Sequence, residues 1–234
     1  MGILYIVATP IGNLEDITIR AMKILASVDA IACEDTRKTG ILLQQVLPLD
    51  SIRPRLVSYY EQNELQRIPE IINALKNGLN IALVSDAGTP TISDPGFKLV
   101  REVIKEGIKV ESIPGPSSVI SSLVSSGLPT DKFLFLGYPP RKPGHRKTFL
   151  QNTASMIRIM KATIIMLEAP HKLVRTLEEM KEVFGDIDIV ICRELTKIHE
   201  EIRREKISES IEHFSKVNPK GEFAILFNAG KQGV

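Results

Sequence analysis

One loop of this chain is rich in glycine and proline yet also holds polar side chains that have no packing role: Asp86, Thr89 and Ser93. The loop follows the apolar run at residues 81–84, which predicts a buried strand, and precedes a helical pattern at residues 97–104. Asp94 and Pro95 are explained by a helix start, as a capping carboxylate and a proline at the first helical position. In a parallel sheet, such a strand–loop–helix unit places a ligand at the carboxyl ends of the strands. The loop is therefore a candidate binding site.

Two further loops also connect a predicted strand to a predicted helix. After the strand at residues 4–9, Gly12 lets the backbone approach a ligand closely, but the G-x-G-x-x-G spacing of dinucleotide sites is missing. In the loop at residues 113–118, two prolines stiffen the chain, and Ser117 and Ser118 offer hydroxyl and N–H groups. An ordinary turn or a helix cap explains each loop alone. Together, the three loops predict one crevice.

A cluster of acids and a base ends another predicted strand, at residues 30–34. It contains Glu34, Asp35 and Arg37. Capping of the following helix by Asp35 or Thr36 explains one of these residues. The three together at a strand's carboxyl end indicate a polar site.

A basic segment lies at residues 138–147, and its candidate RNA contacts are Arg141, Lys142, His145, Arg146 and Lys147. A run of charge is usually a solvated surface. The chain as a whole has a net charge of only +2, so a local basic loop is suited to phosphate contact. His145 is expected to be a contact or a bystander and not a catalyst.

The composition of the 234 residues is that of an ordinary globular protein, with 43% hydrophobic and 25% charged residues. No apolar run has the length of a membrane span, and the first residues predict a strand and not a signal peptide. Cys33 and Cys192 lie in apolar runs, which indicates buried thiols, and no cluster has zinc-site spacing. We therefore predict a cytoplasmic protein without a metal. The absence of Trp disfavours a base-stacking platform.

The elements that must position these residues alternate between strand and helix, which predicts an α/β fold with parallel pairing. The predicted strands cover residues 4–9, 30–34, 55–60, 81–86, 109–113, 133–138, 163–168, 188–193 and 222–227. These are too many for one sheet, and a breaker-rich linker follows Gly127. We predict two α/β domains, residues 1–127 and 128–234, with a ligand site in the cleft between them.

Several segments closely resemble one family, the bacterial 16S ribosomal RNA (cytidine 2′-O)-methyltransferases I, which belong to the tetrapyrrole-methylase-like (class III) S-adenosylmethionine enzymes. The matching segments cover residues 5–18, 34–37, 85–96, 113–118, 136–141, 168–172 and 193–201. The resemblance extends over nearly the whole chain. Many members of the family continue past the last strand, whereas this sequence ends at Val234.

The resemblance implies two α/β domains of the tetrapyrrole methylase type, S-adenosylmethionine in the cleft between them, and a homodimer. The implied cofactor contacts are Pro10, Gly12, Asp86, Ala87, Thr89, Ser117 and Ser118, together with the backbone around Met166, Leu167 and Ala224. The implied substrate is 16S ribosomal RNA, either naked or in the assembled 30S subunit. For the chemistry, we expect Asp35 to accept or orient the 2′-hydroxyl proton beside Glu34, and Arg37 to position the adjacent phosphate.

Three alternatives remain open from the sequence. A methyltransferase acting on a tetrapyrrole or another small molecule is the nearest, although a macrocycle needs a broad apolar trough and not a basic loop. A nucleotide- or RNA-binding module without catalysis is the second. A nicotinamide oxidoreductase is the last, because the glycine fingerprint is missing.

Overall fold

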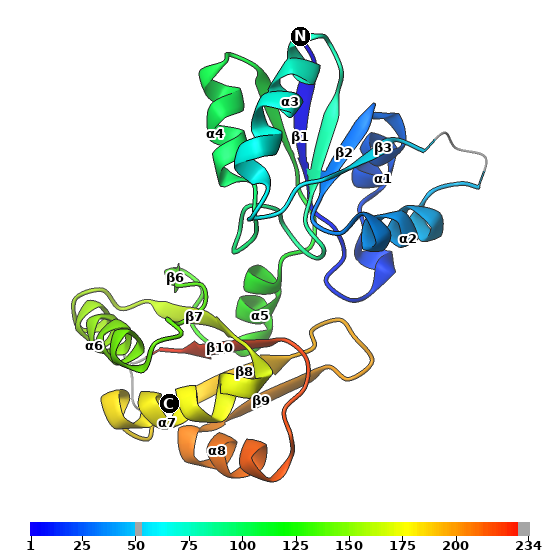
Figure 1. Ribbon diagram of the computed structural model, residues 1–234. Coiled ribbons are helices and arrows are strands. Elements are labelled where there is room, and N and C mark those ends of the chain that lie inside the picture. The colour runs from blue at the N-terminus through cyan, green and yellow to red at the C-terminus, as the bar shows by residue number, and fades with distance from the viewer. Residues whose placement is uncertain (50–52, 229–234) are drawn as a thin grey trace. The chain divides into compact units, whose positions relative to one another are not determined.

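The computed structural model describes residues 1–49 and 53–228, and the chain divides into two compact units, Met1–Ser117 and Ser118–Val234 (Figure 1). Each unit contains one five-stranded sheet with helices packed against it. The α/β fold class predicted from the alternation of strands and helices is confirmed.

The first unit is a parallel sheet with strand order β3-β2-β4-β1-β5. Its elements are β1 (Ile3–Val7), the short 3₁₀ helix η1 (Leu14–Asp16), α1 (Ile19–Ser27), β2 (Ala30–Cys33), α2 (Thr36–Val46), β3 (Arg55–Ser58), α3 (Glu64–Lys76), β4 (Ile81–Val84), α4 (Phe97–Lys105) and β5 (Lys109–Ile113). All five strands point the same way, so the loops that follow them meet at one edge of the sheet.

Alternating side chains of the first sheet enter two separate cores. Leu4 and Leu83 pack with the apolar faces of α3 and α4, whereas Val7 and Val84 pack with those of α1 and α2. The inner strands β2 and β4 are covered on both faces, so their sequences are apolar runs without a polar face, whereas the edge strands β3 and β5 carry exposed charged residues. Figure 1 shows the two helix pairs on opposite faces of this sheet.

The second unit contains a mixed sheet with strand order β6-β7-β10-β8-β9. Its elements are α5 (Ser118–Ser126), β6 (Phe133–Phe135), α6 (Pro143–Ile159), β7 (Thr163–Glu168), η2 (Pro170–Lys172), α7 (Leu173–Phe184), β8 (Asp188–Arg193), β9 (Glu201–Lys206), α8 (Ile207–Lys216) and β10 (Phe223–Phe227). Within the described residues of this sheet, β6–β7 is the one parallel pair. The parallel pairing predicted throughout is therefore wrong for this sheet, because β10 is inserted antiparallel between β7 and β8.

Helix α5 belongs to the second unit, although the predicted boundary at residues 127/128 placed it in the first. Val119 and Leu123 pack on one face of the second sheet with Val190 and Leu226. Helices α6, α7 and α8 pack on the opposite face. Burial of the apolar face of α5 against β10 and β8 fixes the division of the chain at Ser117/Ser118.

Strand β9 escapes prediction because its sequence is almost entirely charged. It is an edge strand paired with β8, and its charges compensate one another along one face. Arg203 donates hydrogen bonds to Glu201 at 3.1 Å and to Glu205 at 2.6 Å. Charged side chains on an edge strand also oppose pairing with other chains. Backbone pairing with β8 and the ion pairs Arg193–Glu201 and Lys206–Asp188 hold the strand at the sheet edge.

Both cysteines are buried free thiols, as predicted. Burial raises the pKa of Cys33 and raises that of Cys192 to about 11, so both thiols remain protonated at neutral pH. Across residues 1–49 and 53–228, no helix combines the length and apolar composition that a membrane span requires.

Candidate functional site

The three loops predicted to share a crevice do come together at the carboxyl edge of the first sheet. Thr9 and Gly88 exchange two backbone hydrogen bonds, of 2.9 and 3.0 Å, which join the loops after β1 and β4. The Thr89 hydroxyl donates to the carbonyl of Pro116 at 3.0 Å, which joins the loops after β4 and β5. Residues far apart in the sequence therefore form one continuous surface, because β4 and β5 flank β1 in the sheet.

The backbone of the loop after β4 is strained at two residues of the site. Thr91 and Ser93 have φ angles of 75° and 63°, which are unusual for residues with a side chain. Strain of this kind persists where the surrounding structure imposes it, and it is frequent at ligand sites. The predicted cap at Asp94 is wrong, because α4 begins at Phe97 with Gly96 in the capping position and without a side-chain cap.

Asp86 projects from this loop toward the loop after β2. Its carboxylate forms an ion pair with Lys38 at 2.6 Å and accepts the backbone N–H of Asp35 at 3.3 Å. These contacts tie the loops after β2 and β4 together. Glu34 lies at the same place, and the negative charges of Asp86 and Asp94 act on it.

The pKa of the Glu34 carboxylate is raised. Burial is the main cause, followed by the charges of Asp94 and Asp86, and together they raise its pKa to about 7. Its Oε1 atom is buried and has no hydrogen-bond partner among the described residues. A carboxylate of this kind exchanges protons near neutral pH.

Asp35 is fully engaged by the backbone and by Arg37. Its Oδ1 accepts the Arg37 N–H at 2.9 Å as the cap of α2, and the Arg37 guanidinium bonds both carboxylate oxygens, at 3.0 and 2.7 Å. These bonds hold the pKa of Asp35 well below its usual range. Such a carboxylate is a weak base, so the geometry favours Glu34 over Asp35 as a proton acceptor.

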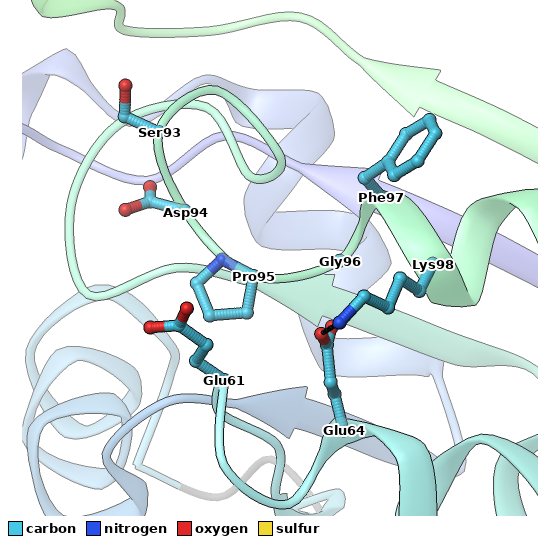
Figure 2. Close-up of a pocket in the computed structure, with 8 residues that line it drawn as sticks. All are labelled: Glu61, Glu64, Ser93, Asp94, Pro95, Gly96, Phe97 and Lys98. Atoms are coloured by element: carbon cyan, nitrogen blue, oxygen red, sulfur yellow. Dashed lines mark hydrogen bonds and ion pairs between the residues drawn. The ribbon is translucent and has the colours of Figure 1, made fainter. Parts of the chain in front are cut away.

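An acidic cavity of about 300 Å³ opens between the loops after β3 and β4. Its lining consists of Glu61, Glu64, Ser93, Asp94, Pro95, Gly96, Phe97 and Lys98 (Figure 2). Glu64 is buried, forms an ion pair with Lys98 at 2.5 Å and accepts a hydrogen bond from Tyr59 at 3.2 Å. Figure 2 shows the Glu61 carboxylate directed toward Asp94 and Pro95. The volume lies at the lower end of the range typical of small-molecule pockets.

In the second unit, the basic segment divides into exposed and buried residues. Arg141, Lys142, His145 and Lys147 are exposed. Arg146 is only 2% exposed, so it is unavailable for the RNA contact predicted for it. Its guanidinium is bidentate on Glu179, at 2.6 and 2.5 Å, and also donates to the carbonyls of Pro140 and Arg141. Arg146 therefore stabilises the conformation of the basic segment through buried hydrogen bonds.

The cofactor contacts predicted in the second unit lie on neighbouring strands. Met166 and Leu167 on β7 pair with Ile225 and Ala224 on β10. Ser118 is the first residue of α5. The segment at residues 168–172 has a structural role at Glu168, whose carboxylate accepts hydrogen bonds from the Ala169 N–H and the Thr176 hydroxyl.

Three residues of the first unit's carboxyl edge escape sequence reasoning: Lys38, Glu61 and Lys98. Lys38 directly follows the acid cluster, which is a weak signal. Glu61 and Lys98 become neighbours of the site only because β3 and β4 both flank β2 in the sheet. No sequence pattern specifies that pairing.

Comparisons with known proteins agree with this architecture. The family model described as Tetrapyrrole (Corrin/Porphyrin) Methylases matches residues 3–210. "Ribosomal RNA small subunit methyltransferase I" of Thermotoga maritima is 46% identical over 232 residues, covering 99% of this chain and 100% of the relative. The protein of the same name in Bacillus subtilis is 45% identical over 226 residues, covering 97% of this chain and 75% of the relative.

A solved structure with the same fold is uroporphyrin-III C-methyltransferase from Thermus thermophilus complexed with S-adenyl homocysteine. It has a TM-score of 0.63 and 16% identity, and the match covers 97% of this chain and 98% of that one. At this identity the likeness concerns the fold alone. Sequence and fold together show that this chain belongs to the tetrapyrrole methylase family, among the relatives named ribosomal RNA small subunit methyltransferase I.

Proposed function

We propose that this protein transfers a methyl group from S-adenosylmethionine to the ribose 2′-oxygen of a cytidine in the RNA of the small ribosomal subunit. The strongest support is the identity of 46% across almost the whole chain with a relative named for methylation of that RNA. The joined loops after β1, β4 and β5, with an acid of shifted pKa beside them, provide a site of suitable chemistry.

The carboxyl edge of the first unit suits S-adenosylmethionine electrostatically. When bound, this cofactor supplies a reactive methyl group on a positively charged sulfur, and the acids Glu34, Asp86 and Asp94 favour a cation nearby. A neighbour of this fold was solved with S-adenyl homocysteine. We assign the cofactor to Pro10, Gly12, Asp86, Ala87, Thr89 and Ser117 in the first unit, and to Ser118, Met166, Leu167 and Ala224 in the second.

The protein's own contribution to methyl transfer is alignment and exclusion of water, because the cofactor is already a strong electrophile. We assign Arg37 to a phosphate of the RNA. Its side chain is 86% exposed, and its pairing with Asp35 holds the guanidinium in one orientation. We expect the protein to act in the cytoplasm. We also expect it to form a homodimer, and analytical ultracentrifugation tests this oligomeric state.

The direct test is mass spectrometry of small-subunit RNA fragments after incubation with protein and cofactor. The expected result is one added methyl group on a cytidine ribose. Parallel incubations with tetrapyrroles and labelled cofactor test the nearest alternative. Label in the tetrapyrrole and none in the RNA would overturn the proposal. Cofactor binding by calorimetry without transfer to any RNA would favour a non-catalytic binding module.

Removing the positive charges of the exposed basic segment should weaken RNA binding and make the RNA affinity depend less steeply on salt concentration. In the triple variant Arg141→Gln, Lys142→Gln, Lys147→Gln, the slope of log K against log[salt] should become shallower by about 2–3, since each lost phosphate contact removes roughly 0.7–0.9. Binding titrations at several salt concentrations measure the slope, and calorimetry should show unchanged affinity for the cofactor.

The matched control for this variant removes three exposed lysines elsewhere: Lys23→Gln, Lys105→Gln and Lys216→Gln. Both triple variants change the net charge equally, so only a local contact separates them. Equal slopes for the two variants would show that the basic segment does not bind phosphates.

A further inference from the structure

We propose that Lys172 and Arg175, at the start of α7, bind phosphates of the RNA together with the basic segment at residues 138–147. The proposal rests on the function proposed above and adds a second segment of the chain to the surface that meets the substrate. Lys172 precedes α7 and Arg175 lies in its first turn. We call these two residues the α7 cations.

The fold brings the α7 cations and the basic segment to the same edge of the second sheet. Strands β6 and β7 are parallel neighbours, with Phe135 opposite Ile165. Their pairing continues beyond the end of β6, because the Leu167 N–H donates to the carbonyl of Gly137 at 3.0 Å. The basic segment follows β6 and the α7 cations follow β7. Both segments therefore begin at one edge, although more than 20 residues separate them in the sequence.

One carboxylate connects the two segments directly. Glu179 accepts hydrogen bonds from Arg146 of the basic segment at 2.6 and 2.5 Å, and from Arg175 at 3.3 Å. Arg146 also donates to the carbonyl of Arg141 at 3.3 Å. The exposed side chain of Arg175 and the backbone of Arg141 are therefore both held next to the buried Arg146–Glu179 pair. Lys172 lies three residues before Arg175, a spacing that places two side chains on the same face of a helix.

This part of the surface is positive because its residues include almost no acids. The chain contains 28 acidic residues, yet Glu168 is the only acid between Asp131 and Glu178. Glu168 is buried, and its carboxylate accepts hydrogen bonds from the Ala169 N–H and the Thr176 hydroxyl. It is therefore engaged inside the protein and does not pair with the cations at the surface.

Three cations of the proposed surface have no partner within the protein. Across residues 1–49 and 53–228, the side chains of Arg141, Lys142 and Lys172 form no hydrogen bond or ion pair. The exposed Lys109, by contrast, pairs with Glu111 at 2.8 Å. Lys142 and Lys172 also stand at the N-terminal ends of α6 and α7, where the helix dipole disfavours a positive charge. Neither pairing nor helix stability explains these side chains, whereas contact with phosphates does.

The arrangement suits a polymer of phosphates. The cations lie on two segments and project from an exposed surface, and RNA carries a phosphate at every nucleotide, so one strand can contact both segments. Contacts of this kind fix the position and orientation of a nucleic acid and do not read its sequence. We therefore expect the α7 cations to contribute to RNA affinity and not to the methyl-transfer step.

The first experiment measures RNA binding by the double variant Lys172→Gln, Arg175→Gln. In titrations with a fragment of small-subunit RNA, the slope of log K against log[salt] should become shallower by about 1.4–1.8, because each lost phosphate contact removes roughly 0.7–0.9. In methylation assays the KM for RNA should rise by a larger factor than kcat falls, since a contact made equally in the ground and transition states affects binding alone.

The matched control is the double variant Arg67→Gln, Lys216→Gln. It removes the same charge, and each of its cations pairs with an acid about one turn away on its own helix, as Arg175 does. The control should keep the wild-type slope, and melting curves by circular dichroism check that both variants are folded. If the test variant keeps the wild-type slope, or if the control changes the slope equally, the inference is overturned.

The second experiment tests contact directly by crosslinking. Because Cys33 and Cys192 are buried, a thiol-reactive photocrosslinker attaches selectively to the exposed thiol of the variant Lys172→Cys. Illumination should crosslink this variant to small-subunit RNA, and the same label on Lys216→Cys should give at least tenfold less product.

The outcomes separate the inference from the function on which it rests. Crosslinking from Lys142→Cys but not from Lys172→Cys would confine RNA binding to the basic segment and overturn the inference. If the wild type binds RNA with the expected slopes but methylates no cytidine ribose, the proposed function fails and the phosphate-binding surface stands.

Discussion

Replacing Arg146 by alanine should destabilise the second unit by about 3–5 kcal/mol, the range observed when one partner of a buried ion pair is removed. The Arg146 side chain is nearly inaccessible and bonds Glu179 through two nitrogens. Its removal leaves the Glu179 carboxylate, with a side chain 17% exposed, facing a void and paired only with the exposed Arg175 at 3.3 Å. Amide hydrogen exchange in α6 and α7 measures the loss, because Arg146 and Glu179 belong to these helices.

The next residue along the chain is a natural control for Arg146. Lys147 is exposed and reaches Glu182 only at 3.5 Å, so Lys147→Ala should cost less than about 1 kcal/mol. The double variant Arg146→Met, Glu179→Leu should recover most of the stability, since it leaves no buried charge unpaired and Arg175, the other partner of Glu179, is exposed. Equal losses for Arg146→Ala and Lys147→Ala would refute the structural role.

The contribution of this pair also depends on pH in a defined direction. Hydrogen bonds from Arg146 lower the pKa of Glu179. The stabilisation is therefore present above the ordinary carboxylate value of 4.5 and is lost as pH falls through the lowered pKa. The difference in the free energy of unfolding between the wild type and Arg146→Ala should therefore become smaller at acid pH.

Gly96→Ala should destabilise the first unit by about 3 kcal/mol, for two reasons that add. Gly96 has φ +130°, a conformation that L side chains rarely adopt, which costs roughly 1–3 kcal/mol. A Cβ there would also lie 2.6 Å from Leu83 Cδ2 and 3.0 Å from Thr91 Cγ2, and overpacking costs about 1–3 kcal/mol. Leu83 cannot move aside, because it is buried in the core of the sheet.

Urea unfolding followed by circular dichroism measures this loss, and Gly107 supplies the comparison. Gly107 also has a positive φ, +68°, but a Cβ there meets no atom within 4 Å. Gly107→Ala therefore reports the backbone strain alone and should cost about 1 kcal/mol. If both alanine variants lose the same stability, the close packing of Gly96 against Leu83 is unimportant.

Local sequence patterns were sufficient for most elements of the fold. The strands at residues 109–113, 163–168 and 188–193 have the predicted bounds. The latter two contain apolar runs, and the first lies between Gly107 and Pro114. Strand β9 does not follow from the sequence pattern, because backbone pairing and ion pairs with β8, and not an apolar run of its own, hold it at the sheet edge. The antiparallel insertion of β10 was missed because an apolar strand looks the same in either direction.

The loops of the site were predictable, whereas the roles of individual side chains within them were not. Gly12, Asp86 and Ser117 lie in loops that directly follow strands. Glycines, prolines and polar residues in such loops indicate the ligand-binding edge of a parallel sheet. Asp35 and Glu34 are adjacent acids, and no sequence rule separates them. The structure does so, since Arg37 binds both oxygens of Asp35 and burial isolates Oε1 of Glu34.

The sequence by itself determined the alternation of strands and helices, the loops that could meet a ligand and the resemblance to one family, because these depend on neighbours within a few residues. Only the tertiary structure decided strand order, the burial of Arg146 and the basicity of Glu34. Strand order sets which loops become adjacent, and burial sets the cost of a charge. Both arise from residues distant in the chain, such as Asp94 acting on Glu34 and Glu179 on Arg146.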